Sequence, residues 1–362
     1  MKRIILLMIT IFMIIPSNVK AITTSATSSI LMDMDSNRIL YSDDIHNIRS
    51  VASISKIMTA ILAIESGKMN NKVIIGNEIK KAYGSGIYIK EGEELTLRDL
   101  VYGLMLRSGN DAALAIANYV SKDTETFVKL MNKKAEELGM NDSTFNNPSG
   151  LDNEKGNYSS AYDMAILMSY ASKNEEFKKI TKTKKYTLKT NMNTYIWYNK
   201  NKLLSNYKYA TGGKTGFTEI ARRTLVTTAS KNDLNLVVVT LNDGNDWTDH
   251  KNLFEYGFEK YKKYKILDKN KFEVKDDTYY DKYKLYIKND YSYPILNGEE
   301  QNILVKIELK KIRKLEDNQK VGEANIYLSD EKIHTENIFI KLNKEKKISI
   351  ITKIKKWIKN IW

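Results

Sequence analysis

Residues 52–60 read ASISKIMTA and place Ser53 and Lys56 three positions apart at the start of a predicted helix. Side chains three apart on a helix lie on the same face, so the lysine amine can reach the serine hydroxyl. A lysine kept neutral by burial and neighbouring positive charge can accept the serine proton. The first helical turn also offers backbone N–H groups to a developing oxyanion. The stretch therefore predicts nucleophilic serine chemistry at Ser53.

Two further motifs accompany this one. Ser108-Gly109-Asn110 lies between two predicted helices, where a hydroxyl and an amide can project into a cleft, although an ordinary helix N-cap has the same residues. Lys214-Thr215-Gly216 occurs once and precedes a β-rich run, so it can line an edge strand that is open to a substrate. Ser-x-x-Lys recurs at 17–20, 205–208 and 329–332, and Ser-x-Asn at 172–174 and 230–232.

The ordered set Ser-x-x-Lys, Ser-x-Asn, Lys-Thr-Gly is the signature of β-lactamases and penicillin-binding proteins. The sequence around these motifs, from about residue 25 to 262, resembles the serine D-alanyl-D-alanine carboxypeptidases, the low-molecular-mass penicillin-binding proteins. This resemblance implies a β-lactamase/transpeptidase-like α/β domain, an antiparallel sheet flanked by helices. The stretches that carry it are ASISKIMTA (52–60), LMLRSGNDAALAIA (104–117), LGMNDSTFNNPSGLD (138–152), YSSAYDMA (158–165) and TGGKTGFT (211–218).

The resemblance also implies catalytic roles for three residues. Ser53 would form the acyl-enzyme, and Lys56 would be the base that activates it. Ser108 would relay a proton toward the leaving D-alanine. The implied activity removes the terminal D-alanine of peptidoglycan stem peptides without a metal or cofactor, and β-lactam antibiotics would act as covalent inhibitors.

Five more residues would bind the substrate if the resemblance holds. Asn110 would hold the peptide backbone, and Lys214 and Thr215 would bind the terminal carboxylate by charge and by hydrogen bond. Gly216 would leave the strand edge open. The backbone N–H of Phe217 would join that of Ser53 in the oxyanion hole.

Composition excludes several other chemistries. The 362 residues include no cysteine and three histidines, which rules out thiol catalysis, disulfides and zinc-thiolate sites. Residues 22–340 hold 47 Lys+Arg against 43 Asp+Glu, a net charge of +4 that is too mild for a nucleic-acid-binding face.

Both termini predict a location. Lys2 and Arg3 precede an apolar run over 4–15, so residues 1–21 predict a secretory signal peptide cleaved after Ala21 and an exported protein. Residues 346–362 place isoleucines and Trp357 at spacings of three and four with lysines between them. Such an amphipathic helix is typical of a segment that binds an anionic membrane surface, here the outer face of the cytoplasmic membrane. Docking of the helix on the protein itself is an alternative.

Between the termini the pattern predicts two domains. Residues 22–264 alternate strands and helices, and residues 265–345 predict a small all-β domain. We expect a hairpin over 28–41, helices over 53–65, 97–106, 111–120 and 250–264, a strand pair over 221–230 and 234–241, and later strands over 283–287, 303–309, 325–328 and 337–342.

Some conspicuous residues receive plainer interpretations. Arg222 and Arg223 follow Lys-Thr-Gly where the family often has small residues, and we interpret them as solvated on a strand. Residues 147–151, Asn-Pro-Ser-Gly-Leu, predict a structural turn. His250 is interpreted as a helix-start residue rather than a base.

Three alternative functions stay open at this stage. A β-lactamase shares the motifs, but its class A form needs a glutamate with an asparagine four residues on, and here Tyr158 follows Glu154 at that spacing. A D,D-endopeptidase or transpeptidase has the same motifs. A catalytically silent wall-binding protein would fail to acylate Ser53. The sequence does not choose between a vegetative role and one in the spore cortex.

Overall fold

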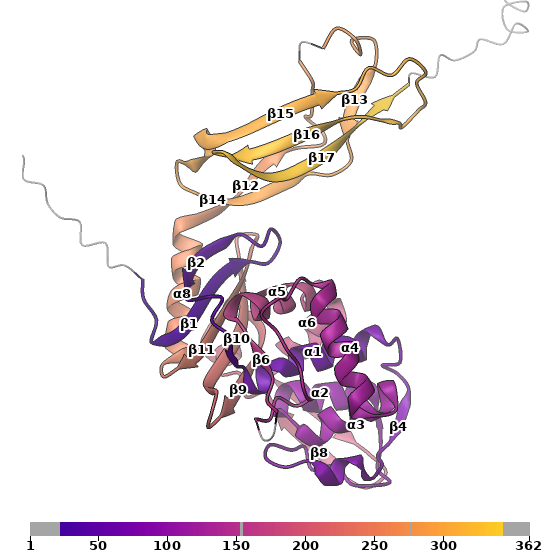
Figure 1. Ribbon diagram of the computed structural model, residues 1–362, viewed down its shortest axis with the longest axis vertical. Helices are drawn as coiled ribbons and strands as arrows, with labels where there is room; N and C mark the ends of the chain where they lie inside the picture. The colour runs from indigo at the N-terminus through magenta and orange to yellow at the C-terminus, as the bar shows by residue number, and fades with distance from the viewer. Residues whose placement is uncertain (1–21, 153–154, 276, 343–362) are drawn as a thin grey trace, which may run out of the picture.

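The computed structural model describes residues 22–152, 155–275 and 277–342 (Figure 1). A five-stranded antiparallel sheet with the order β2-β1-β11-β10-β9 forms the centre of the larger domain. Its strands are β1 (Ala26–Asp33), β2 (Ile39–Asp43), β9 (Ala210–Thr218), β10 (Arg222–Lys231) and β11 (Leu234–Asp243).

The central strands are nearly continuous apolar runs because helices cover both faces of the sheet. Successive side chains of a strand point to opposite faces. In β1, Ile30 and Met32 therefore pack into the core beneath the main group of helices, whereas Leu31 packs with Phe254 of the opposite helix α8 (Asp246–Lys260). Figure 1 shows α8 on one side of the sheet and α1 to α6 on the opposite side.

The helical side positions the functional motifs. The short 3₁₀ turn η1 (Ala52–Ser55) leads directly into the buried helix α1. A capping box between Thr96 and Asp99 starts α2, which ends one residue before Ser108. The helices are α1 (Lys56–Glu65), α2 (Leu97–Arg107), α3 (Asn110–Ser121), α4 (Thr124–Glu137), α5 (Ala161–Ala171), α6 (Glu175–Lys182) and the short α7 (Leu203–Asn206).

Three small strand pairs and a second 3₁₀ turn complete this domain. The pairs are β3 (Arg49–Ser50) with β6 (Tyr158–Ser159), β4 (Lys72–Ile74) with β5 (Glu94–Thr96), and β7 (Lys185–Lys189) with β8 (Thr194–Tyr198); the turn is η2 (Asn77–Lys81).

The second domain is all β and has its own apolar core, which includes Val321, Ile326 and Ile338. It contacts the first domain through Arg38, which forms an ion pair of 2.7 Å with Glu299. Its elements are β12 (Tyr261–Leu267) paired with β14 (Tyr291–Leu296), the turn η3 (Glu299–Asn302), and a four-stranded sheet of order β13-β17-β16-β15 made by β13 (Lys284–Ile287), β17 (Glu331–Lys341), β16 (Lys320–Leu328) and β15 (Ile303–Leu309).

The predicted elements are present with differences in their bounds, and the strands expected over 325–328 and 337–342 begin earlier, at Lys320 and Glu331. Ser53 lies on the 3₁₀ turn η1, so only Lys56 belongs to α1. The helix expected over 250–264 begins at Asp246 and ends at Lys260, because residues 261–264 instead pair with β14. Residues 1–21 and 346–362, which carry the predicted signal peptide and membrane helix, lie outside the described residues. Within the described ranges, no helix is both long and apolar enough to cross a bilayer.

Candidate active site

The three motifs meet at one cavity of about 320 Å³ where η1, the end of α2 and the edge strand β9 come together. Ser53, Ser108, Thr215, Gly216 and Phe217 all line it. Behind this wall lie three further predicted residues, Lys56, Asn110 and Lys214, each of which is at most 3% exposed. The cavity therefore unites residues that are up to 164 positions apart in the sequence.

The turn that carries Ser53 is held in an unusual conformation. Ala52 has φ +50°, a left-handed value that is unfavourable for a residue with a Cβ atom. The Ala52 carbonyl accepts a 2.8 Å hydrogen bond from Ser55, and the Val51 carbonyl accepts one of 3.0 Å from Thr224. These contacts fix the backbone on both sides of Ser53, whose side chain stays partly exposed to the cavity.

Lys56 is buried with three neutral acceptors around its amine. Its Nζ lies 3.0 Å from the Ser53 hydroxyl and 2.7 Å from Oδ1 of Asn110, and it also donates to the Ser149 carbonyl. Burial disfavours the charged form and, together with the nearby charge of Lys200 and against the opposing charge of Asp111, lowers the pKa of Lys56 to about 7. A large fraction of Lys56 is therefore a neutral base near pH 7, within reach of Ser53.

Ser108 and Lys214 form the second polar pair of the cavity. Ser108 caps the end of α2 with φ +64°, which turns its hydroxyl toward β9. Nζ of Lys214 donates a hydrogen bond of 3.0 Å to that hydroxyl and one of 2.7 Å to the Thr215 carbonyl. Burial, followed by the charges of Lys56 and Lys200, holds the pKa of Lys214 well below its usual range. A bound carboxylate would favour the charged form of Lys214.

Asn110 is committed to contacts within the protein. Its Oδ1 accepts from Lys56, its Nδ2 donates 2.6 Å to the Tyr83 carbonyl, and its backbone N–H donates 2.8 Å to the Ser85 carbonyl. These bonds join the base to the loop over 83–85. The contact of Asn110 with substrate stays a prediction. The second hydrogen on Nδ2 is available to make that contact.

Gly216 allows β9 to lie against the nucleophile turn. A Cβ atom at this position would lie 3.1 Å from the backbone nitrogens of Ser53 and Ile54 and 2.3 Å from the Thr224 hydroxyl. Only a residue without a side chain fits this approach. The closeness keeps the backbone of the next residue, Phe217, beside Ser53, while the Phe217 ring is 60% exposed at the mouth of the cavity.

The structure adds contributors that sequence reasoning missed. The loop over 147–151 supplies the Ser149 carbonyl to Lys56, and its Gly150 has φ +78°. A Cβ at Gly150 would lie 2.0 Å from the Ala52 carbonyl, so this turn supports the nucleophile. Lys200 lines the cavity and donates 3.2 Å to Ser85. Gly150 could have indicated from the sequence that this loop makes a tight turn. Nothing in the sequence distinguishes Lys200 from the many other lysines.

Two of the plainer interpretations can now be compared with the geometry. Arg223 is not simply solvated: it makes a two-point ion pair with Asp246, and both residues line the cavity. His250 is fully buried between the hydroxyls of Thr227 and Thr240, at 2.6 and 3.0 Å. Burial lowers the pKa of His250 to about 3, so it is a neutral structural residue within α8 and away from the cavity.

Comparison with known proteins identifies the family to which this chain is similar. Residues 16–245 match the family described as D-alanyl-D-alanine carboxypeptidase, and residues 261–353 match the C-terminal domain of penicillin-binding protein 5. The chain is 34% identical over 308 residues to D-alanyl-D-alanine carboxypeptidase DacF of Bacillus subtilis, covering 81% of this chain and 77% of that protein. The crystal structure of penicillin-binding protein 5 from Haemophilus influenzae superimposes with a TM-score of 0.75 at 28% identity, covering 90% of this chain and 99% of that one.

The chain belongs to the D-alanyl-D-alanine carboxypeptidase family. It is a serine D-Ala-D-Ala carboxypeptidase of peptidoglycan metabolism, with stem peptides as its substrate class and β-lactams as ligands. The predicted fold class is confirmed for the catalytic α/β domain and the all-β domain that follows it.

Proposed function

We propose that Ser53 attacks the carbonyl carbon of the penultimate D-alanine while Lys56 accepts its hydroxyl proton. The observation that carries this proposal is the 3.0 Å contact between the two side chains, at a lysine whose pKa is about 7. A general base is most effective when its pKa lies near the working pH. The Oγ–carbon bond forms as the proton moves to Nζ.

The leaving D-alanine needs a proton as its bond to the carbonyl carbon breaks. Ser108 faces the cavity and receives a hydrogen bond from Lys214, so its own hydroxyl hydrogen is available to the leaving nitrogen. We assign this relay to Ser108: as it gives its hydrogen to the leaving nitrogen it takes one from Nζ of Lys214, and the proton that Lys56 accepted from Ser53 restores the Ser108–Lys214 pair. Lys214 and Thr215 bind the terminal carboxylate. Asn110 holds the peptide backbone, and water then hydrolyses the ester on Ser53.

The tetrahedral intermediate carries its negative charge on the former carbonyl oxygen. We assign its stabilisation to the backbone N–H groups of Ser53 and Phe217, which the close approach at Gly216 brings to the same cavity. Backbone donors that are fixed in place before the reaction need no rearrangement when the charge develops.

Incubation with a labelled penicillin, peptide mapping and a D-alanine release assay on diacetyl-Lys-D-Ala-D-Ala test this assignment together. Stable label on Ser53 with D-alanine released supports it. Label that is rapidly lost with no D-alanine released indicates a β-lactamase, and absence of label indicates a silent wall-binding protein. Cleavage of cross-linked muropeptides at a higher kcat/KM than the free pentapeptide indicates an endopeptidase.

Lys200 gives a pH-dependent prediction. Because acylation needs neutral Lys56, its rate should rise with pH through a midpoint near 7. Lys200→Gln removes a positive charge that disfavours protonated Lys56, so the pKa of Lys56 should rise and the midpoint should move to higher pH. Stopped-flow measurement of acylation against pH checks this, with the exposed neighbour Lys202→Gln as control. A midpoint that is unmoved or lower in Lys200→Gln would contradict the role of Lys200.

We further propose that the protein is exported and that residues 346–362 bind an anionic membrane surface on its outer side. The support is the residue pattern of the two terminal segments. Deleting 346–362 should abolish co-sedimentation with vesicles that contain phosphatidylglycerol and leave D-alanine release unchanged. Purely zwitterionic vesicles are the control, and a truncated protein that still sediments with anionic vesicles refutes the anchor.

A further inference from the structure

Positive charge is concentrated on one short segment away from the active site. Residues 173–189 hold seven lysines and two glutamates, a net charge of +5, whereas residues 22–340 as a whole carry only +4. Both glutamates are already paired, Glu175 with Lys178 and Glu176 with Arg98. The body outside this segment is therefore close to neutral, and the excess charge of the described domains lies on α6 and β7.

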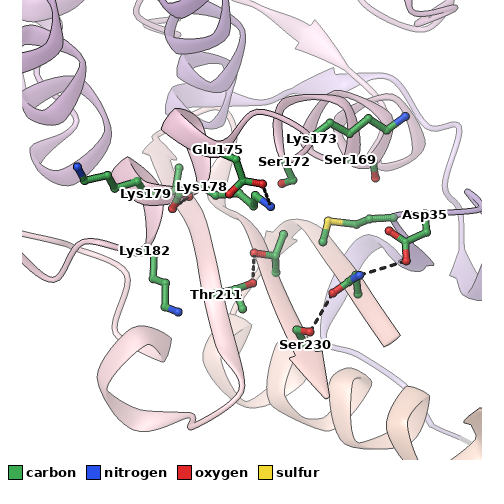
Figure 2. Close-up of a pocket in the computed structure, with 14 residues that line it drawn as sticks. Asp35, Ser169, Ser172, Lys173, Glu175, Lys178, Lys179, Lys182, Thr211 and Ser230 are labelled. Carbon is green, nitrogen blue, oxygen red and sulfur yellow. Dashed lines mark hydrogen bonds and ion pairs between the residues drawn. The ribbon is translucent and has the colours of Figure 1, made fainter. Parts of the chain in front are cut away.

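A cavity larger than the catalytic one lies against this segment. It measures about 670 Å³, within the range of about 300–1,000 Å³ typical of ligand sites. Figure 2 shows Lys178, Lys179 and Lys182 of α6 on one side and Thr211 and Ser230 of the sheet on the other. The cavity shares no lining residue with the catalytic one, because it lies at the opposite end of β9 from Thr215 and Phe217.

All four lysines of this cavity are exposed, and three of them have no ionic partner among the described residues. Within the described ranges, Lys173, Lys179 and Lys182 form no ion pair, so their charges are neutralised by solvent alone. Lys178 and Lys182 stand one helical turn apart, about 5–6 Å between Cβ atoms. Their positions suit successive charges along a ligand rather than a single small anion.

The floor of the cavity is lined by hydroxyl groups. Ser169, Thr181 and Thr228 are each at most 3% exposed, and Thr211 and Thr228 share a 2.7 Å hydrogen bond. A hydroxyl that donates to a partner keeps acceptor lone pairs for a ligand O–H. Such a floor suits a polyhydroxylated molecule and offers few contacts to an apolar one.

We propose that this cavity binds a polyanionic chain of phosphodiester-linked polyols or sugars, separately from catalysis. Lysine binds phosphate as a point charge without a fixed bidentate geometry, so lysines spaced along a helix suit successive phosphates of a chain. The cavity is lined by four lysines, by no arginine and by two carboxylates that are each already paired, Glu175 with Lys178 and Asp35 with Lys263. The hydroxyl floor then accepts the polyol groups between the phosphates, and bound polymer would hold the enzyme within a phosphate-rich matrix.

Fluorescence anisotropy of the full chain with a labelled poly(glycerol phosphate) oligomer measures this binding. The variant K173Q/K179Q/K182Q should bind roughly tenfold more weakly, because exposed charge pairs are individually weak but additive. K284Q/K310Q/K332Q removes the same charge from exposed lysines of the β-rich domain and should leave affinity nearly unchanged. Equal losses in both variants would show that net charge alone attracts the oligomer and would overturn the proposal.

A second variant tests the hydroxyl floor. T211V/T228V replaces two mutually bonded hydroxyls by groups of the same shape, a change that is often nearly neutral for folding. It should weaken the binding of poly(glycerol phosphate) but leave the binding of inorganic polyphosphate of equal charge unchanged. Wild-type protein that binds inorganic polyphosphate more tightly than the oligomer would refute the assignment. D-alanine release, unchanged in every variant, confirms folding.

Discussion

Ser53→Ala is expected to abolish covalent labelling by penicillin and to lower kcat/KM for D-alanine release by a factor on the order of 10⁶, as loss of a nucleophile does in serine peptidases. The reason is that Oγ of Ser53 is the atom that would form the ester, and it is also the hydroxyl within 3.0 Å of Lys56. Intact-protein mass spectrometry after incubation with penicillin and an enzyme-coupled D-alanine assay measure the two effects.

Ser55→Ala is the matched control for this prediction. Ser55 lies in the same turn and is fully buried, but its hydroxyl bonds to the Ala52 carbonyl and Nδ2 of Asn157 and makes no contact with Lys56. Its loss should reduce the free energy of unfolding by about 1–3 kcal/mol while the label on Ser53 persists. Acylation that survives in Ser53→Ala would disprove the nucleophile assignment.

The grouping of the side chains of the site could be predicted because each motif is local and the three occur together in a fixed order. Lys214-Thr215-Gly216 occurs once in the chain, and the order of the three motifs restricts which Ser-x-x-Lys is relevant. The hairpins could also be predicted from the sequence. The turns after β1 and before β11 contain Asn or Asp residues, which tolerate the positive φ found at Asn37, Asn232 and Asp233.

The contributions that escaped prediction are of a different physical kind. The Ser149 carbonyl acts through the backbone, which has no residue-type signature. Lys200 and Arg223 reach the cavity only through tertiary packing, and isolated basic residues are abundant in this chain. Strand β14 includes Pro294, a residue that usually argues against a strand, and it is tolerated in a two-stranded pair.

Lys56→Met should lower the rate of acylation by about 10²–10⁴, the contribution typical of a positioned general base. Methionine keeps a long side chain in the buried position but leaves Ser53 without an acceptor for its proton. Penicillin acylation rates at pH 8 measure the loss. Thr59→Val, one turn along α1, removes a buried hydrogen bond to the Pro148 carbonyl and should cost stability without a comparable loss of acylation.

The same variant has a second readout in stability against pH. The pKa of Lys56 is about 7 in the folded protein and about 10.5 when unfolded, so between these values the unfolded state binds more protons. The free energy of unfolding of the wild type should therefore rise with pH across this interval, with up to about 1.4 kcal/mol per pH unit from this group. Lys56→Met removes that contribution, so its stability should rise less steeply between pH 7.5 and 10. Parallel stability curves for the two proteins would mean that Lys56 is charged in the folded enzyme, and a charged amine could not accept the proton of Ser53.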